Sequence, residues 1–189
     1  MSADLYNNYS ELAEAQTEGV DYQIRLHLRS QSDTAVIVPH GGSIERRTTE
    51  IGEAVAGNEF NFYAFEGLHE EGTYDILHIT SHRFDEPQCL TMVQNSLRVV
   101  TIHGYGGDEE QLLLGGRDTK LVQLLAHACR QTGVPTLTEN HQYPGIRPNN
   151  ICNRGLTGMG VQIEFSDALR GGVSEGRVIN AIRDVLLTY

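Results

Sequence analysis

The chain has 189 residues, of which 39% are hydrophobic and 21% charged, proportions typical of a soluble globular protein. Its formal net charge is −11, and this acidity disfavours nucleic-acid binding, which needs a basic surface to neutralise phosphates. No apolar run approaches the roughly 18 residues of a membrane span, and residues 1–8 lack the basic and apolar segments of a signal peptide. We therefore expect a single domain over residues 1–189, with neither a nucleic-acid nor a membrane partner.

The three cysteines are odd in number and form no CxxC motif. Cys89, Cys129 and Cys152 are therefore expected to be free thiols in a reducing compartment. Cys129 falls on a predicted helix, where it is expected to serve packing.

The first half of the chain alternates helical and strand patterns. Apolar residues at helical spacing predict helices over residues 3–17, 43–56 and 87–94. Strict alternation over residues 20–29 predicts an edge or solvent-facing strand, and β-branched or aromatic runs predict strands over residues 34–38, 60–65 and 74–80.

The second half continues the alternation. Strands are predicted over residues 97–103 and 161–165, and Asp118 and Ser174 begin two predicted helices. Residues 140–153, with two prolines and four asparagines, form a predicted long loop. Strands that alternate with helices indicate an α/β fold, with one mixed open sheet flanked by helices.

Two of the predicted strands end in the same way. Residues 36–42 begin with an apolar run and end in Pro39-His40-Gly41-Gly42. Residues 99–107 likewise begin with an apolar run, which is followed by His103-Gly104. Open α/β sheets bind ligands outside the carboxyl ends of their strands, so His40 and His103 are expected to converge. Glu45 follows in what is predicted to be the first turn of a helix, and two histidines with a carboxylate are a donor set for catalytic zinc. The alternative is a structural histidine beside an exposed glutamate.

His78 and His82 compete for the third ligand position. His78 lies within the apolar run Ile76-Leu77-His78-Ile79, where a buried structural histidine is the simpler interpretation. His82 follows the predicted strand and is interpreted as a substrate-binding residue or one that supports a ligand.

Glu164 and the pair Asn153-Arg154 complete the candidate site. Glu164 lies in the strand Val161–Phe165, where a carboxylate directed at a metal-bound water would be a general base with a raised pKa. A solvent-facing glutamate is the equal alternative. Arg154 could hold a substrate carboxylate bidentately, or it could be an ordinary exposed loop arginine.

Six runs of this sequence resemble the phage poly-γ-glutamate hydrolases: VPHGGSIE, SHRFDEP, VVTIHGYGGDE, GGRD, ENHQYPGIRPNNICNRG and GVQIEFS. The resemblance extends over nearly the whole chain and implies a carboxypeptidase A-like fold with one zinc ion on His40, Glu45 and His103. It further implies Glu164 as general base and acid, and Asn153-Arg154 as a clamp for the substrate carboxylate and the transition state. Arg83 is a weaker candidate for the clamp.

One departure from carboxypeptidases is clear. They separate the first two ligands as HxxE, whereas His40 and Glu45 here are five residues apart. No motif matches their tyrosine over the substrate, so no tyrosine is assigned.

The implied function is zinc-dependent hydrolysis of the γ-glutamyl amide bonds of poly-γ-glutamate, by a monomer that strips a bacterial capsule on behalf of a phage. Without a signal peptide, the protein would be made in the host cytoplasm and act outside the cell after host lysis. Two alternatives stay open: a zinc amidase or carboxypeptidase acting on another γ-glutamyl or cell-wall peptide, and a non-catalytic phage protein.

Overall fold

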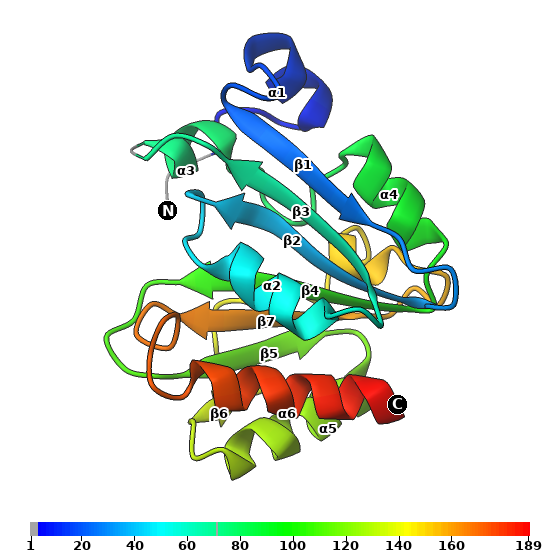
Figure 1. Cartoon of the computed structure of the whole chain (residues 1–189), viewed down its shortest axis with the longest axis vertical. Helices are drawn as coiled ribbons and strands as arrows, with labels where there is room; N and C mark the ends of the chain where they lie inside the picture. The colour runs from blue at the N-terminus through cyan, green and yellow to red at the C-terminus, as the bar shows by residue number, and fades with distance from the viewer. Residues whose placement is uncertain (1–3, 71) are drawn as a thin grey trace.

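A computed structural model of the protein describes residues 4–70 and 72–189. The strands of these residues form one mixed sheet. Within these residues seven strands follow the order β1-β3-β2-β4-β7-β5-β6, which Figure 1 shows from β1 at the upper end to β6 at the lower. The bounds are β1 Tyr22–His27, β2 Thr34–Gly42, β3 Asn61–Gly67, β4 Arg98–Tyr105, β5 Leu112–Gly116, β6 Thr136–Leu137 and β7 Val161–Ser166. The fold class, an α/β protein with a mixed sheet flanked by helices, is confirmed.

The central strands run parallel, which decides where a site can form. β2 pairs in parallel with β3 and β4, and β4 pairs in parallel with β7. β1 and β5 are antiparallel to their neighbours β3 and β7. The carboxyl ends of β2, β4 and β7 therefore meet at one edge of the sheet, where α/β proteins place their ligands.

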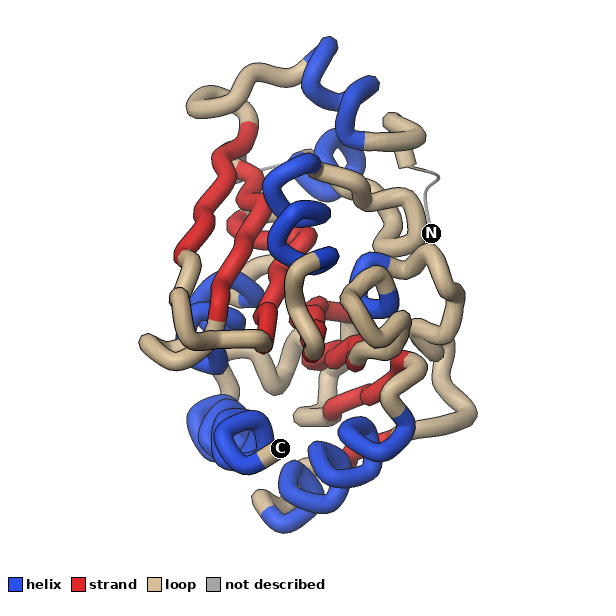
Figure 2. Tube along the Cα trace, turned by 90° about the vertical axis from the view of Figure 1, so that its right-hand side faces the viewer, coloured by secondary structure: helices blue, strands red, loops and turns tan. Residues whose placement is uncertain are grey.

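Helices cover both faces of the sheet (Figures 1 and 2). The helices are α1 Tyr9–Ala15, α2 Thr48–Ala56, α3 Thr73–Leu77, α4 Pro87–Gln94, α5 Thr119–Gln131 and α6 Glu175–Thr188, with a short 3₁₀ helix η1 Ile151–Asn153. One core lies under α2, α5 and α6, and the other lies under α1, α3, α4 and η1. Both faces of the central strands are thus buried, which explains their continuous apolar runs.

Most of the predicted elements are present, with three corrections. Residues 74–80, predicted as a strand, contain α3 and then an irregular segment. Glu45 lies in a turn before α2, since that helix begins at Thr48 and not at Ser43. β5 and β6 were not predicted as strands, because the apolar run of β5 is short and ends in two glycines, and the two residues of β6 are too few to show alternation. All three cysteines are free, as expected, and all three are buried. No described helix is long and apolar enough to cross a bilayer.

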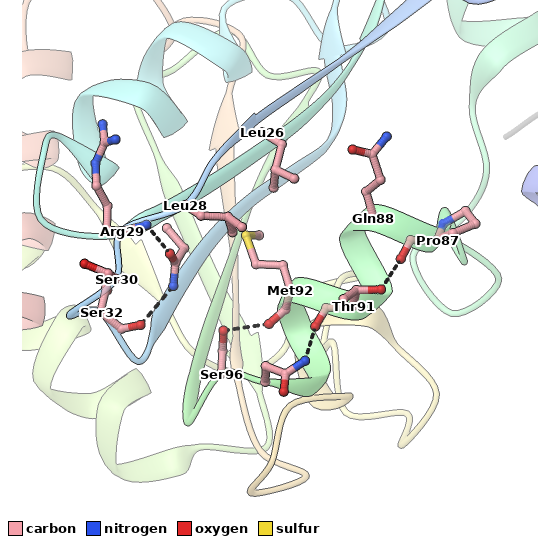
Figure 3. A pocket seen from close by; sticks show the side chains of 12 residues that line it. Leu26, Leu28, Arg29, Ser30, Ser32, Pro87, Gln88, Thr91, Met92 and Ser96 are labelled. Carbon is pink, nitrogen blue, oxygen red and sulfur yellow. Dashed lines mark hydrogen bonds between the residues drawn. The ribbon is translucent and has the colours of Figure 1, made fainter.

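An apolar groove lies away from the strand ends that carry the histidines. It has a volume of about 560 Å³ and runs between β1 and α4, where Leu26, Leu28 and Met92 point into it (Figure 3). Its polar groups are largely occupied by local bonds, such as the backbone N–H of Arg29 donating to Asn61 at 2.7 Å. It contains none of the candidate catalytic residues.

The loop of residues 138–150 packs against β5 through a glycine. A Cβ on Gly115 would overlap the carbonyl oxygen of Pro144 and press on that of Tyr143. Gly115→Ala should therefore lower the free energy of unfolding by about 1–3 kcal/mol, as overpacking does. Denaturant unfolding measures the change. Gly176→Ala in α6 is the control, since nothing lies within 4 Å of its added methyl, and equal effects of both changes would contradict the close packing of this loop.

Candidate active site

Three of the candidate residues come from neighbouring parallel strands. His40 lies in β2, His103 in β4 and Glu164 in β7, each only 2–4% exposed. The register of β4 and β7 places His103 directly opposite Glu164. The Nδ1 atoms of the two histidines are 3.2 Å apart. The expected convergence at the carboxyl ends of the strands is therefore present in the structure.

Glu45 reaches the histidines because the chain turns back sharply after β2. Gly42 has a φ of 62°, a left-handed conformation that favours glycine. The backbone N–H of Glu45 then donates to the carbonyl of His40 at 3.0 Å and closes the turn. Its carboxylate lies 2.9 Å from His40 Nδ1 and accepts from the Gly104 backbone N–H at 2.7 Å. Burial raises the pKa of Glu45, but His40 and His103 outweigh it and hold the pKa well below its usual range.

The donor atoms of His40, Glu45 and His103 fit a zinc ion. The separations are 2.9 Å from His40 Nδ1 to Glu45, 3.2 Å between the two Nδ1 atoms, and 3.7 Å from His103 Nδ1 to Glu45. Donors around tetrahedral zinc, bonded at about 2.0–2.1 Å, lie roughly 3.3 Å apart.

The hydrogen bonding of His40 also favours a cation at this point. Its Nε2 lies 2.8 Å from the carbonyl oxygen of Ile79, which can only accept, so Nε2 carries the proton. In the neutral ring, Nδ1 then presents a lone pair to the carboxylate of Glu45. The lone pair and the carboxylate repel each other, and a metal ion or an added proton between them would remove this repulsion. Such a backbone contact is also how proteins fix the tautomer of a ligating histidine.

His78 belongs to this cluster and is not the buried core residue that the apolar run indicated. It follows α3, and its ring lies tilted against that of His40 with ring centres 4.1 Å apart. It offers a third donor to a group with His40 and Glu45. Its Nδ1 lies 2.7 Å from Asp4 Oδ1, which leaves Nε2 for a ligand. Burial and His40 lower the pKa of His78 to about 4, so the ring is neutral near pH 7. A metal ion held by His40 and Glu45 would take its third ligand from His103 or His78.

Glu164 is buried, so the solvent-facing alternative is wrong. Burial and the nearby Glu45 raise its pKa from 4.5 to about 8. Its Oε1 accepts from the side-chain amide of Gln162 at 2.8 Å. A buried carboxyl with a raised pKa beside a donor cluster has the properties of a general acid and base.

The raised pKa of Glu164 predicts a pH dependence in the metal-free protein. Between pH 4.5 and about 8 the folded state holds a proton that the unfolded chain releases, so this group's contribution to stability falls as pH rises. Glu164→Gln removes the group. The free energy of unfolding of the Glu164→Gln protein, minus that of wild type, should therefore increase from pH 5 to pH 8. Denaturant unfolding of both metal-free proteins measures this, and parallel pH curves would contradict a raised pKa.

Asn153 has its hydrogen-bonding capacity filled by the protein itself. Its amide donates to the carbonyls of Gly145 at 2.7 Å and Arg147 at 3.0 Å. Its Oδ1 accepts from the backbone N–H groups of Gly160 at 3.1 Å and Arg117 at 3.3 Å. It fixes the long loop in this structure, and its role as a substrate ligand stays a prediction.

Arg154 and Arg83 also have protein partners in this structure. Arg154, half-buried, donates to the carbonyl of Phe84 at 3.3 Å. Arg83, exposed, donates to Asn7 at 3.4 Å. Neither forms an ion pair within residues 4–70 and 72–189. Their roles toward substrate stay predictions.

His82 lies beside an arginine that the sequence did not single out. Arg147, exposed on the long loop, lies 3.2 Å from His82 Nε2, and Asn149 donates to the His82 carbonyl at 3.0 Å. The preceding residue, Ser81, reaches within 3.4 Å of His103 Nε2. Burial and the two arginines lower the pKa of His82, so Arg83 and Arg147 supply the positive charge and His82 a hydrogen-bonding group on a surface that borders the donor cluster. No motif marks Arg147, because the loop brings it there from 65 residues away.

Three tyrosines, also unassigned from the sequence, surround the cluster. Tyr74 stacks on His78, and burial together with Glu45 raises its pKa to about 12. Tyr105 and Tyr143 lie with ring centres 5.8 Å apart, and burial and Glu164 raise the pKa of both. A hollow of about 310 Å³ beside Glu45 includes Tyr74, Tyr105 and Arg170 in its lining. The strand-end position of Tyr105, two residues after His103, was the available sequence signal.

Residues 6–180 match the family described as poly-gamma-glutamate hydrolase. The chain belongs to this family. One relative in sequence is the UPF0714 protein YndL of Bacillus subtilis (strain 168), 36% identical over 169 residues. The match covers 88% of this chain and 66% of YndL, so the chain spans slightly less than two thirds of that relative's length.

Two solved structures support the same family. The structure of a bacteriophage poly-gamma-glutamate hydrolase is 31% identical with a TM-score of 0.91, covering 99% of this chain and 98% of that one. A structure described as zinc-free apo YndL is also 31% identical, with a TM-score of 0.83 and coverage of 98% and 96%. The poly-gamma-glutamate hydrolase fold thus extends over nearly all of this chain.

Proposed function

We propose that this chain is a zinc-dependent hydrolase that cleaves the γ-glutamyl amide bonds of poly-γ-glutamate. The observation that carries the proposal is the convergence of His40, Glu45 and His103 on one point, beside the buried Glu164. Membership of the poly-gamma-glutamate hydrolase family supports the substrate. One zinc per chain, a monomeric state and action on a host capsule after lysis are parts of the same proposal.

His40 and Glu45, with His103 or His78, would hold a zinc ion, which when bound would supply a Lewis acid to polarise the scissile carbonyl and acidify water. Glu164 accepts the proton of the attacking water and returns it to the nitrogen of the leaving amine. Its buried position suits this exchange, because a carboxyl with a pKa near the working pH can both take and release a proton.

The substrate side of the proposal rests on charge. Poly-γ-glutamate carries one free α-carboxylate per residue, and the protein has a formal net charge of −11, so attraction must come from a local surface. His82, Arg83 and Arg147 provide cationic and hydrogen-bonding groups beside the donor cluster. Arg154 and Asn153 would join them if substrate displaced their present partners.

The experiment compares substrates at equal concentrations of amide bonds. The protein is incubated with purified poly-γ-glutamate and, separately, with cell-wall muropeptides, each with and without a zinc chelator. The proposal predicts chain shortening of the polymer alone, abolished by the chelator. Cleavage of muropeptides with an intact polymer would establish a cell-wall amidase, and no cleavage of either would favour a non-catalytic protein.

A further inference from the structure

We propose that Gln162, oriented by Asn150, is a positioning residue that holds the carboxylate of Glu164 in its reactive orientation. This inference rests on the proposed function, since it assigns a task to a residue that supports Glu164. Gln162 and Glu164 are two residues apart in β7 and lie on the same face of the sheet. Both are nearly inaccessible, at 5% and 4% exposure.

A buried chain of hydrogen bonds joins the long loop to the carboxylate. The amide of Asn150 donates to Gln162 Oε1 at 2.8 Å, and the amide of Gln162 donates to Glu164 Oε1 at 2.8 Å. Asn150 is itself only 6% exposed. Buried side-chain amides with well-placed partners hold one geometry, because breaking either bond leaves a polar group unsatisfied.

The contact of Asn150 with the backbone fixes the orientation of both side-chain amides, that of Asn150 and that of Gln162. Asn150 Oδ1 accepts from the backbone N–H of Cys152 at 3.1 Å, and a backbone N–H can only donate. The amide nitrogen of Asn150 must therefore face Gln162, which in turn must present its oxygen to Asn150 and its nitrogen to Glu164. A reversed Gln162 would place its oxygen against the carboxylate.

The packing around Gln162 leaves its side chain little freedom. In β5, the residue paired with Gln162 is Gly115. The long loop closes over it, since a Cβ on Gly145 would lie only 3.0 Å from Gln162 Cβ. With Oε1 held by Gln162, Glu164 Oε2 has no hydrogen-bond partner within the described ranges 4–70 and 72–189. The structure thus leaves one oxygen of Glu164 available for proton transfer.

The test reverses the amide without removing the loop's own contact. Asn150→Asp keeps an oxygen for the Cys152 N–H but loses the donor to Gln162, so Gln162 turns and presents its oxygen to Glu164. We expect kcat on poly-γ-glutamate to fall about 10- to 100-fold, as when a residue that orients a metal-site group is lost. KM and zinc content should stay within about twofold of wild type. Gln162→Met, which fills the same space without a donor, should give the same fall in kcat with KM and zinc content nearly unchanged.

Asn8→Asp is the matched control. Asn150 is the residue before η1, and Asn8 is in the same way the residue before α1. The Asn8 side chain accepts from the backbone N–H of Glu11 at 2.9 Å. This change should leave kcat unaltered. A readout independent of activity comes from nuclear magnetic resonance of the metal-free protein. The side-chain amide protons of Gln162 should exchange slowly in wild type and at least tenfold faster in Asn150→Asp.

The outcomes separate this inference from the proposed function. The positioning role is wrong if wild type cleaves the polymer and the Asn150→Asp and Gln162→Met proteins, both folded and loaded with zinc, retain the wild-type kcat. Unchanged amide exchange in Asn150→Asp would also overturn it, even if that variant melts earlier. If wild type itself leaves the polymer intact, the proposed function fails, and the exchange experiment still decides whether Asn150 orients Gln162.

Discussion

Replacement of Glu164 by glutamine should lower kcat on poly-γ-glutamate by about 10²- to 10⁴-fold, the range that general acid–base catalysis contributes. Glutamine has the shape of the carboxyl and can still accept from Gln162, but it can neither take nor release the proton. Zinc content should stay at the wild-type level, because Glu164 is not among the proposed ligands. Chain length of the polymer after timed incubation measures the change.

Glu66→Gln is the control for this replacement. Glu66 is a second buried glutamate of the same sheet, at 6% exposure, but its carboxylate accepts from Gln23 and Arg25 and not from the candidate site. This variant should retain wild-type kcat. A Glu164→Gln protein that cuts the polymer at the normal rate would remove Glu164 from the mechanism.

Replacement of the proposed zinc ligands should show which histidine completes the set. His40→Ala and His103→Ala should each weaken zinc binding by more than about 10²-fold, beyond the 10- to 100-fold expected when a residue only orients a ligand. His78→Ala should fall within that smaller range, because His103 approaches both His40 Nδ1 and the Glu45 carboxylate. Competition with a chromophoric chelator measures each affinity.

His69→Ala is the reference for these variants. It removes an exposed histidine whose contact is Asp21, at 2.8 Å, and it should leave zinc affinity unchanged. Loss of zinc in His78→Ala with normal affinity in His103→Ala would reverse the assignment. The ligands would then be His40, Glu45 and His78, the group whose donor atoms lie within 4.8 Å of one another.

Much of the framework was readable from local patterns. The apolar runs that end in His40 and His103 are buried parallel strands, and Pro87 and Asp118 begin helices as expected. These features depend on hydrophobic periodicity and on capping groups, which act within a few residues. The convergence at one edge of the sheet followed from the rule for parallel strands.

The errors arose where tertiary contacts outweigh local pattern. His78 stands in an apolar run, yet Ile76 is exposed and the segment forms α3, because Leu77 and Ile79 alone face the core. The burial of Glu164 could not be read from alternation, because a strand covered on both faces buries both sets of side chains. Arg147 and Tyr143 reach the site through the fold of a long loop, which carries no periodic signal.

The most direct test of the central claim is a titration of metal-free protein with zinc, in which the chain length of poly-γ-glutamate is measured at each step. We expect no shortening without metal, an onset with the first zinc added, and saturation at one zinc per chain. Shortening at full rate in the metal-free protein, or an intact polymer at zinc saturation, would contradict the claim.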